Sequence, residues 1–223
     1  GDAFVEAFRK TSLPPDMVAS IHVGHAVIRK LIDARAVDFI SFTGSVEGGR
    51  EVYQAASSRL LDMGLELGGK DPAFVCEDAN FAFAVENLVD GAFYNAGQSC
   101  CAVERIYVMR PLFSRFVDAY VAEVEKYKVG DPEDETTTVG PLAQPKTVEF
   151  VESQVNEAVG RGARVLTGGR RLPGPGYYFQ PTVLVDVDHS MGVMMEESFG
   201  PVIGIMPVDS EEDAVRLMND SPY

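Results

Sequence analysis

The residues best suited to covalent chemistry lie in one short stretch, which reads Asn-Ala-Gly-Gln-Ser-Cys-Cys from Asn95 to Cys101. Small residues around Cys100 leave space for a substrate, and Gly97 lets the backbone approach a ligand closely. A cysteine beside free backbone N–H groups holds a larger share of thiolate. The same groups could bind the oxyanion that forms when a thiolate attacks a carbonyl. Cys100 is therefore a candidate nucleophile, although a buried and inert thiol is the commoner fate of a free cysteine.

The other two cysteines have simpler interpretations. Cys76 lies in an apolar stretch, where a thiol packs as a small apolar side chain. Cys101 is expected to support packing, although a thiol next to a nucleophile could also trap an oxidised sulfur. Three cysteines cannot all pair, and this odd count favours a reducing compartment, which predicts a cytoplasmic protein.

A candidate general base precedes the cysteine stretch. Glu66 stands between Leu65 and Leu67 in an apolar segment that is expected to form a strand. A carboxylate buried in such a place would hold a proton more readily than one in water, which suits a general base. Exposure at the end of a strand, with no chemistry attached, is the alternative for Glu66.

A candidate anion site lies earlier in the chain, where Thr43, Gly44 and Ser45 connect an expected strand to an expected helix. The free N–H groups and the dipole at a helix N-terminus bind anions such as phosphate. Ser45 could cap that helix or form a hydrogen bond with a phosphate. For these three residues alone a plain helix cap is the simpler interpretation, and the sequence has no Gly-x-Gly-x-x-Gly fingerprint.

The elements that must position these residues alternate between strand and helix, which is typical of an α/β fold with a parallel sheet and crossover helices. Strands are predicted at 18–23, 38–42, 63–67, 72–76, 105–108, 163–166, 181–187 and 201–208. Helices are predicted at 3–10, 26–34, 46–58, 80–94, 112–127, 147–161 and 211–218. The pair Gly68-Gly69 marks an expected boundary between residues 1–68 and 69–223, since glycines allow a sharp crossing there.

Composition and charge exclude several classes of function. The 223 residues, 46% of them hydrophobic, suffice for one large domain or parts of two. The net charge of −15 argues against nucleic acids and anionic membranes as partners. No apolar run reaches the roughly 18 residues of a membrane span. The histidines His22, His25 and His189 are scattered without metal-ligand spacing, so we expect no metal site.

Four blocks of the sequence, in the same order along the chain, resemble motifs of the aldehyde dehydrogenase family. Asn95–Cys100 is similar to the nucleophile motif Asn-x-Gly-Gln-x-Cys, and Leu65–Lys70 is similar to the general-base motif. Phe42–Ser45, with Gly49 after it, resembles the cofactor-binding turn between a strand and a helix. Glu196–Pro201 resembles the motif on the nicotinamide side. The resemblance runs from end to end of the chain, and four ordered blocks are far more specific than one tetrapeptide.

The resemblance implies NAD(P)-dependent oxidation of an aldehyde to a carboxylic acid. Cys100 would attack the aldehyde to form a thiohemiacetal and then a thioester. Glu66 would activate the water that hydrolyses the thioester, which favours release of a free acid over transfer to coenzyme A. Asn95 and Gln98 are expected to fix the loop by hydrogen bonds, and Lys70 is expected to form a structural ion pair.

The resemblance also implies NAD or NADP as the cofactor and a division of the chain into two parts. Residues 1–68 would be the C-terminal part of a Rossmann-like NAD(P)-binding domain, and residues 69–223 the N-terminal part of the catalytic domain. Glu197 would accept hydrogen bonds from the nicotinamide ribose, and Phe199 would offer a face to the ring. The implied cofactor-binding residues are Thr43, Gly44, Ser45, Gly49, Leu67, Glu197 and Phe199.

Members of the family are considerably longer than this chain. We therefore expect a central piece of a longer protein that is inactive alone, whose full-length form is a homodimer or homotetramer acting on a small aldehyde. Two alternatives stay open. One is a cysteine hydrolase with Cys100 and a histidine base, although no histidine lies at a suggestive position. The other is a non-catalytic binding or structural fragment that retains the fold.

Overall fold

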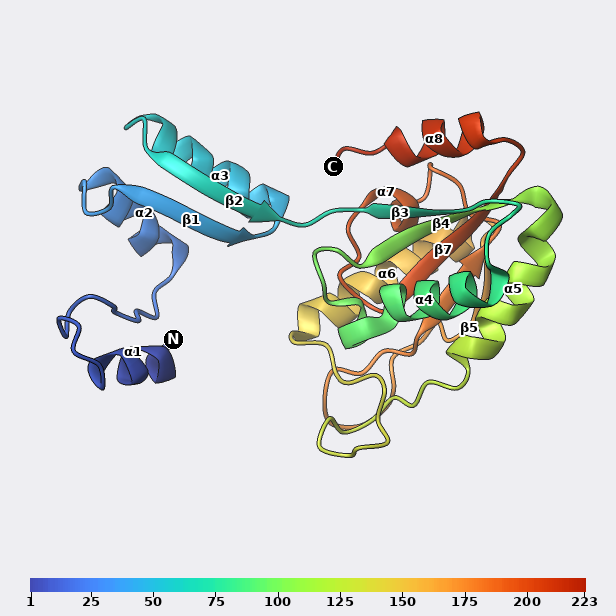
Figure 1. The fold of residues 1–223 in the computed structure, drawn as a ribbon, viewed down its shortest axis with the longest axis horizontal. Coiled ribbons are helices and arrows are strands. Elements are labelled where there is room, and N and C mark those ends of the chain that lie inside the picture. Colours follow the sequence, from blue (N-terminus) through green and yellow to red (C-terminus); the bar gives the residue numbers. More distant parts are fainter. The chain divides into compact units, whose positions relative to one another are not determined.

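The computed structural model describes all 223 residues, which divide into two compact units, Gly1–Leu67 and Gly68–Tyr223. Figure 1 shows the helices and strands of each unit. Both units combine helices with parallel strands, and this confirms the predicted α/β class. Each helix is too short or too polar to span a lipid bilayer.

Unit 1 (Gly1–Leu67) contains a two-stranded parallel sheet and three helices. Its elements are α1 (Asp2–Arg9), α2 (His25–Asp33), β1 (Phe39–Gly44), α3 (Val46–Ser57) and β2 (Asp62–Leu67). Helix α3 provides the crossover that two parallel strands require. The register places Thr43 opposite Glu66 and Gly44 opposite Leu67, at the carboxyl ends of both strands.

Helix α3 approaches the sheet of unit 1 closely because its inner face is made of small residues. Gly49, Ala55 and Ala56 are its buried residues. A Cβ atom at Gly49 would lie only 2.7 Å from Cδ2 of Leu67, so a larger residue there would force the Leu67 side chain to move. The two predicted cofactor-binding residues Gly49 and Leu67 therefore form the contact between α3 and β2.

The predicted strand at residues 18–23 does not form, and this prediction is wrong. The segment has no regular structure, and Ile21 and Val23 expose 60% and 41% of their surface. A strand needs a neighbour for its N–H and C=O groups. In unit 1, β1 and β2 pair only with one another, so the β-branched residues of this segment have no ladder to join.

Unit 2 (Gly68–Tyr223) is built on a five-stranded sheet in the order β3-β4-β7-β6-β5. Its strands are β3 (Asp71–Val75), β4 (Val103–Met109), β5 (Arg164–Thr167), β6 (Thr182–Val185) and β7 (Val202–Val208). Its helices are α4 (Phe81–Phe93), the 3-10 turn η1 (Tyr94–Gly97), α5 (Arg110–Val124), α6 (Pro145–Gly160), α7 (Gly192–Met195) and α8 (Glu211–Asn219).

The sheet of unit 2 is parallel, as predicted, except at one edge. Strand β5 pairs antiparallel with β6. The two strands are joined without an intervening helix, by a loop that contains an antiparallel bridge between Arg171 and Phe179. A chain that turns back directly must return antiparallel, since a parallel return needs a crossover.

Successive residues of the central strands point to opposite faces of this sheet and form two cores. On one face Ile106, Val108 and Ile203 pack with residues of α4 and α5. On the other face Tyr107 and Leu184 pack with residues of α6, α7 and α8. The sheet is thus covered on both faces by helices (Figure 1), and the loops at the ends of β3, β4 and β7 are held by a rigid scaffold.

Candidate active site

Cys100 lies in a tight turn between η1 and β4, and its side chain is exposed. The N–H of Ala102 donates to the carbonyl of Ser99 at 3.2 Å and closes the turn. Cys101 is exposed as well, whereas Cys76, just after β3, is partly buried. Cys100 is therefore open to an incoming electrophile, and the packing role expected for Cys101 has no support in its exposure.

The backbone before Cys100 takes an uncommon conformation. Asn95, Ala96 and Gly97 are all left-handed, with φ of 51°, 58° and 72°. For a residue with a Cβ atom this conformation costs roughly 1–2 kcal/mol. The Nδ2 group of Asn95 donates to the carbonyl of Gln98 at 3.0 Å, and Nε2 of Gln98 donates to the carbonyl of Asn95 at 3.1 Å. These reciprocal bonds confirm the prediction that Asn95 and Gln98 fix the loop.

Gln98 also ties this loop to a neighbouring segment. Its Oε1 accepts from the N–H of Ala143 at 2.8 Å, and its Nε2 donates to the carbonyl of Pro141 at 3.3 Å. The side-chain amide of Gln98 thus accepts from one N–H group and donates to one carbonyl outside the loop, and it donates to one carbonyl inside it. An acidic side chain has no N–H group to donate, and the glutamine is required for that reason.

Gly97 brings the cysteine loop against the turn formed by residues 197–200. A Cβ atom at Gly97 would collide with the carbonyl oxygen of Gly200 and would lie 3.2 Å from that of Ala92. The two backbones are therefore in direct contact. Through this contact the structure places the candidate nucleophile loop beside the segment that carries Glu197 and Phe199.

Substituting Gly97→Ala should destabilise unit 2 by about 3–5 kcal/mol, since it adds left-handed strain to a backbone collision. Gly162→Ala is the matched control, because Gly162 also has positive φ but no atom lies within 4 Å of the position that its new methyl group would take. The control should lose only about 1–2 kcal/mol. Urea unfolding followed by circular dichroism measures both. Equal losses in the two variants would show that Gly97 makes no close contact with Gly200.

The 197–200 turn presents an acidic and an aromatic side chain. Phe199 is left-handed, with φ of 47°, and 40% exposed. Glu197 is partly buried, and its Oε1 is buried without a hydrogen-bond partner. Burial, followed by the charge of Glu104, raises the pKa of the Glu197 carboxyl. A hydrogen bond from the backbone N–H of Gly69 to the carboxylate opposes that shift. A carboxylate has acceptor capacity for more than one donor, which fits a ligand that brings a hydroxyl group, as the ribose of a dinucleotide does.

A buried ion pair between Lys70 and Glu104 supports the turn of residues 197–200. Lys70 Nζ lies 2.6 Å from Glu104 Oε2, and this confirms the ion pair predicted for Lys70. Burial lowers the pKa of Lys70, and the neighbouring Glu104 opposes that shift. Glu104 was missed as a site residue. The available signal was its position beside Arg105 at the start of an otherwise apolar strand, where two charged residues indicate buried partners.

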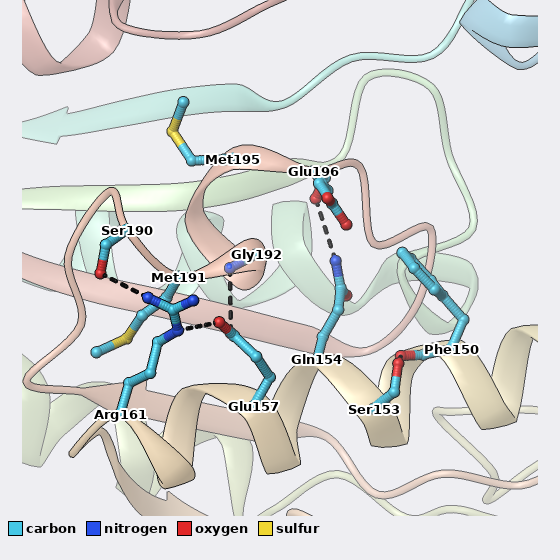
Figure 2. A pocket seen from close by; sticks show the side chains of 10 residues that line it. All are labelled: Phe150, Ser153, Gln154, Glu157, Arg161, Ser190, Met191, Gly192, Met195 and Glu196. Atoms are coloured by element: carbon cyan, nitrogen blue, oxygen red, sulfur yellow. Dashed lines mark hydrogen bonds and ion pairs between the residues drawn. The ribbon is translucent and has the colours of Figure 1, made fainter.

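Helices α6 and α7 support the backbone just before Glu197. They line a shallow pocket, shown in Figure 2, that does not include Cys100. Nε2 of Gln154 donates to the carbonyl of Glu196 at 3.4 Å, and the N–H of Gly192 donates to Glu157 at 3.2 Å. Helix α6 therefore holds both the start of α7 and the residue that precedes Glu197.

The predicted cofactor turn of unit 1 has the geometry of a capped helix end. Thr43 and Gly44 close β1, and Ser45 is the N-cap of α3. The Ser45 Oγ accepts from the N–H of Gly48 at 3.1 Å. The capping interpretation is thereby confirmed. The first turn of α3 keeps further N–H groups that have no intrahelical carbonyl and remain open to an anion.

Glu66 is exposed, which is the second of the two alternatives considered for its position in β2. Successive side chains of a strand point to opposite faces, and Leu67 packs against α3. The side chain of Glu66 therefore points to the opposite face of the sheet from Leu67, where it is exposed. Its neighbour across the sheet is Thr43, so unit 1 joins the candidate base to the candidate cofactor turn.

The histidines offer no base for Cys100 in unit 2. His189 is 12% exposed, and its Nε2 lies 2.7 Å from the hydroxyl of Tyr107. Its Nδ1 lies 2.8 Å from Oδ2 of Asp220. Both ring nitrogens are therefore occupied, and this argues against a cysteine hydrolase that uses His189.

Comparison with known proteins gives a consistent answer. Residues 2–223 match the model of the aldehyde dehydrogenase family. The chain is 39% identical to lactaldehyde dehydrogenase of Escherichia coli over 201 residues, which is 90% of this chain and 42% of that protein. It is 38% identical to a probable NADP(+) succinate-semialdehyde dehydrogenase of Sinorhizobium fredii, over 90% of this chain and 41% of that one.

A solved structure shows the same similarity in three dimensions. Betaine aldehyde dehydrogenase of Staphylococcus aureus in complex with NAD+ superposes with a TM-score of 0.84 at 35% identity. The match covers 88% of this chain and 40% of that chain. The chain thus spans less than half the length of these relatives. With a family match over nearly every residue and relatives well above 30% identity, the chain belongs to the aldehyde dehydrogenase family.

Proposed function

We propose that this protein takes part in the oxidation of an aldehyde to a carboxylic acid with NAD or NADP as the oxidant. The observation that carries the proposal is the contact between Gly97 and Gly200, which sets the exposed Cys100 loop beside Glu197. A nucleophilic thiol and an unpartnered buried carboxylate oxygen are thereby offered by neighbouring loops. The relatives' names, which are all those of aldehyde dehydrogenases, support the same chemistry.

In the proposed reaction the Cys100 thiolate forms a bond to the aldehyde carbon, giving a thiohemiacetal. Loss of hydride from that carbon leaves a thioester on Cys100. The nicotinamide, when bound, supplies the hydride acceptor. Glu66 then takes a proton from a water molecule that attacks the thioester carbon, and the Cys100 sulfur leaves as the acid is released.

We propose that each unit, taken by itself, offers groups suited to binding the cofactor. In unit 1 the open N–H groups after Ser45 would take a phosphate, with Thr43, Gly44, Gly49 and Leu67 shaping the same end of the sheet. In unit 2 Glu197 would accept from ribose hydroxyls, and Phe199 would contact the nicotinamide. Under this assignment unit 1 is part of a Rossmann-like cofactor-binding domain, and unit 2 is part of the catalytic domain.

The proposed function is tested by incubating the full-length protein with a panel of small aldehydes and with NAD+ and NADP+ in parallel. Formation of the reduced cofactor, followed by its absorbance, should depend on the aldehyde and should be accompanied by an equal amount of carboxylic acid. Residues 1–223 alone should turn over little, because the relatives are more than twice as long. Cofactor binding without turnover of any aldehyde would instead favour a non-catalytic binding role.

A further inference from the structure

We propose that Glu104 and Lys70 act as a positioning pair that fixes the turn of Glu197, Ser198 and Phe199 for the ribose and nicotinamide of the cofactor. This inference rests on the proposed function and extends it to two residues that would not touch substrate or cofactor. Their charges are nearly inaccessible, since the side chains of Lys70 and Glu104 are 0% and 6% exposed. Any effect on the reaction must therefore pass through the residues that they hold.

Glu104 binds the turn through its backbone. Its two carboxylate oxygens accept from the N–H of Ser198 at 3.1 and 2.8 Å, and Oε1 also accepts from the N–H of Phe199 at 3.0 Å. Two successive N–H groups that converge on one anion form a nest, and a left-handed residue is typical of that arrangement. The left-handed φ of 47° at Phe199 is thus matched by a carboxylate at the centre of the nest.

Lys70 completes the support of this turn. Its Nζ donates to Glu104 at 2.6 Å and to Oγ of Ser198 at 2.9 Å. Its backbone carbonyl accepts from Nε of Arg105 at 2.8 Å, which ties the start of β3 to β4. A pair that served only to join β3 and β4 would need no bond to the turn. Here both of its members bond to Ser198.

The pair also borders the carboxylate that is proposed to bind ribose. A Cβ atom at Gly68 would collide with the carboxylate of Glu197, so that carboxylate rests against the backbone two residues before Lys70. Its Oε1 is buried and lacks a hydrogen-bond partner. The pair therefore fixes two segments that border Glu197. Glu104 holds the turn of Ser198 and Phe199, and Lys70 holds the backbone of residues 68–70.

Glu104→Gln tests the inference in the full-length protein. The amide keeps the shape of the carboxylate but loses its charge and one acceptor oxygen. We expect the KM for NAD+ or NADP+ to rise by about tenfold, the cost of one charge-assisted hydrogen bond, while the KM for the aldehyde stays within about twofold. Hydrogen–deuterium exchange at Ser198 and Phe199 should accelerate by at least about tenfold, since these amides lose their acceptor.

The matched control is Glu152→Gln, which breaks an exposed pair with Arg171 elsewhere in unit 2 and should change neither readout. If Glu104→Gln does not fold, the double variant Lys70→Met/Glu104→Gln removes both charges and avoids an unpaired buried lysine. Wild-type KM in either variant overturns the inference, even if exchange is faster. Failure of the unaltered protein to bind either cofactor overturns the proposed function as well, and is seen without any variant.

Discussion

Replacing Cys100 with serine should lower aldehyde oxidation by at least about 10⁴-fold, since a serine hydroxyl without an adjacent base is a far weaker nucleophile than a thiolate. Cofactor binding should be unchanged, because the side chain of Cys100 makes no hydrogen bond that holds the loop. The loop is held by Asn95 and Gln98, which the substitution leaves in place. The initial rate of reduced-cofactor formation, with each cofactor at saturation, measures the effect.

Cys101→Ser is the control for Cys100, and it is a demanding one because both thiols are exposed. The Cys101 Sγ lies 3.3 Å from Oγ of Ser99, whereas no such contact engages Cys100. The Cys101 variant should keep at least about half of the wild-type rate, in keeping with a surface substitution away from the chemistry. Iodoacetamide should label Cys100 well before Cys101 and Cys76. Equal labelling of all three, or a large loss in Cys101→Ser, would contradict the assignment.

Most of the scaffold of unit 2 follows from the sequence pattern. Strand β7 and the part of β4 after Arg105 are apolar runs with both faces buried, which indicates a sheet covered by helices on each side. The pattern of α4, with Val85, Val89 and Phe93 on one face, predicts its length to within a residue or two. These elements were predictable because burial repeats along them with a fixed period.

The features that were missed depend on contacts between distant segments. The left-handed conformation of Ala96 has no composition signal, because it is stabilised by the hydrogen bonds of Gln98 to residues 141 and 143 and by the contact of Gly97 with Gly200. Likewise, β5 is antiparallel because its loop to β6 turns straight back. Residues 18–23 have the composition of a strand but no neighbouring strand to pair with. The sequence of one segment does not show whether a partner strand is present.

The sequence could predict which residues belong to the candidate site, but it could not predict how they are arranged in space. Motif similarity singled out Cys100, Glu197 and Phe199, because those residue types are tied to the reaction. It could not indicate Glu104, whose role follows from the three-dimensional nest of two N–H groups. Nor could it indicate that Glu66 is exposed, since strand composition alone does not tell which face is covered.

Glu66→Gln should separate the two halves of the proposed reaction and lower steady-state turnover by about 10²–10⁴-fold, the usual contribution of a general base. Formation of the thioester does not need this carboxylate, so a burst of reduced cofactor, about equal in amount to the enzyme, should remain. Hydroxylamine, which attacks thioesters without a base, should restore much of the turnover. Rapid mixing that resolves the burst from the steady state provides the measurement.

Asp62→Asn is the matched control for Glu66→Gln, because it removes an exposed carboxylate at the opposite end of the same strand, β2. It should leave both the burst and the steady state unchanged, since it lies at the amino end of the strand and Glu66 lies at the carboxyl end beside Thr43. Loss of the burst in Glu66→Gln would mean that Glu66 acts before the thioester forms. Full steady-state activity would mean that another group activates the water, and the exposed position of Glu66 would then need no chemical explanation.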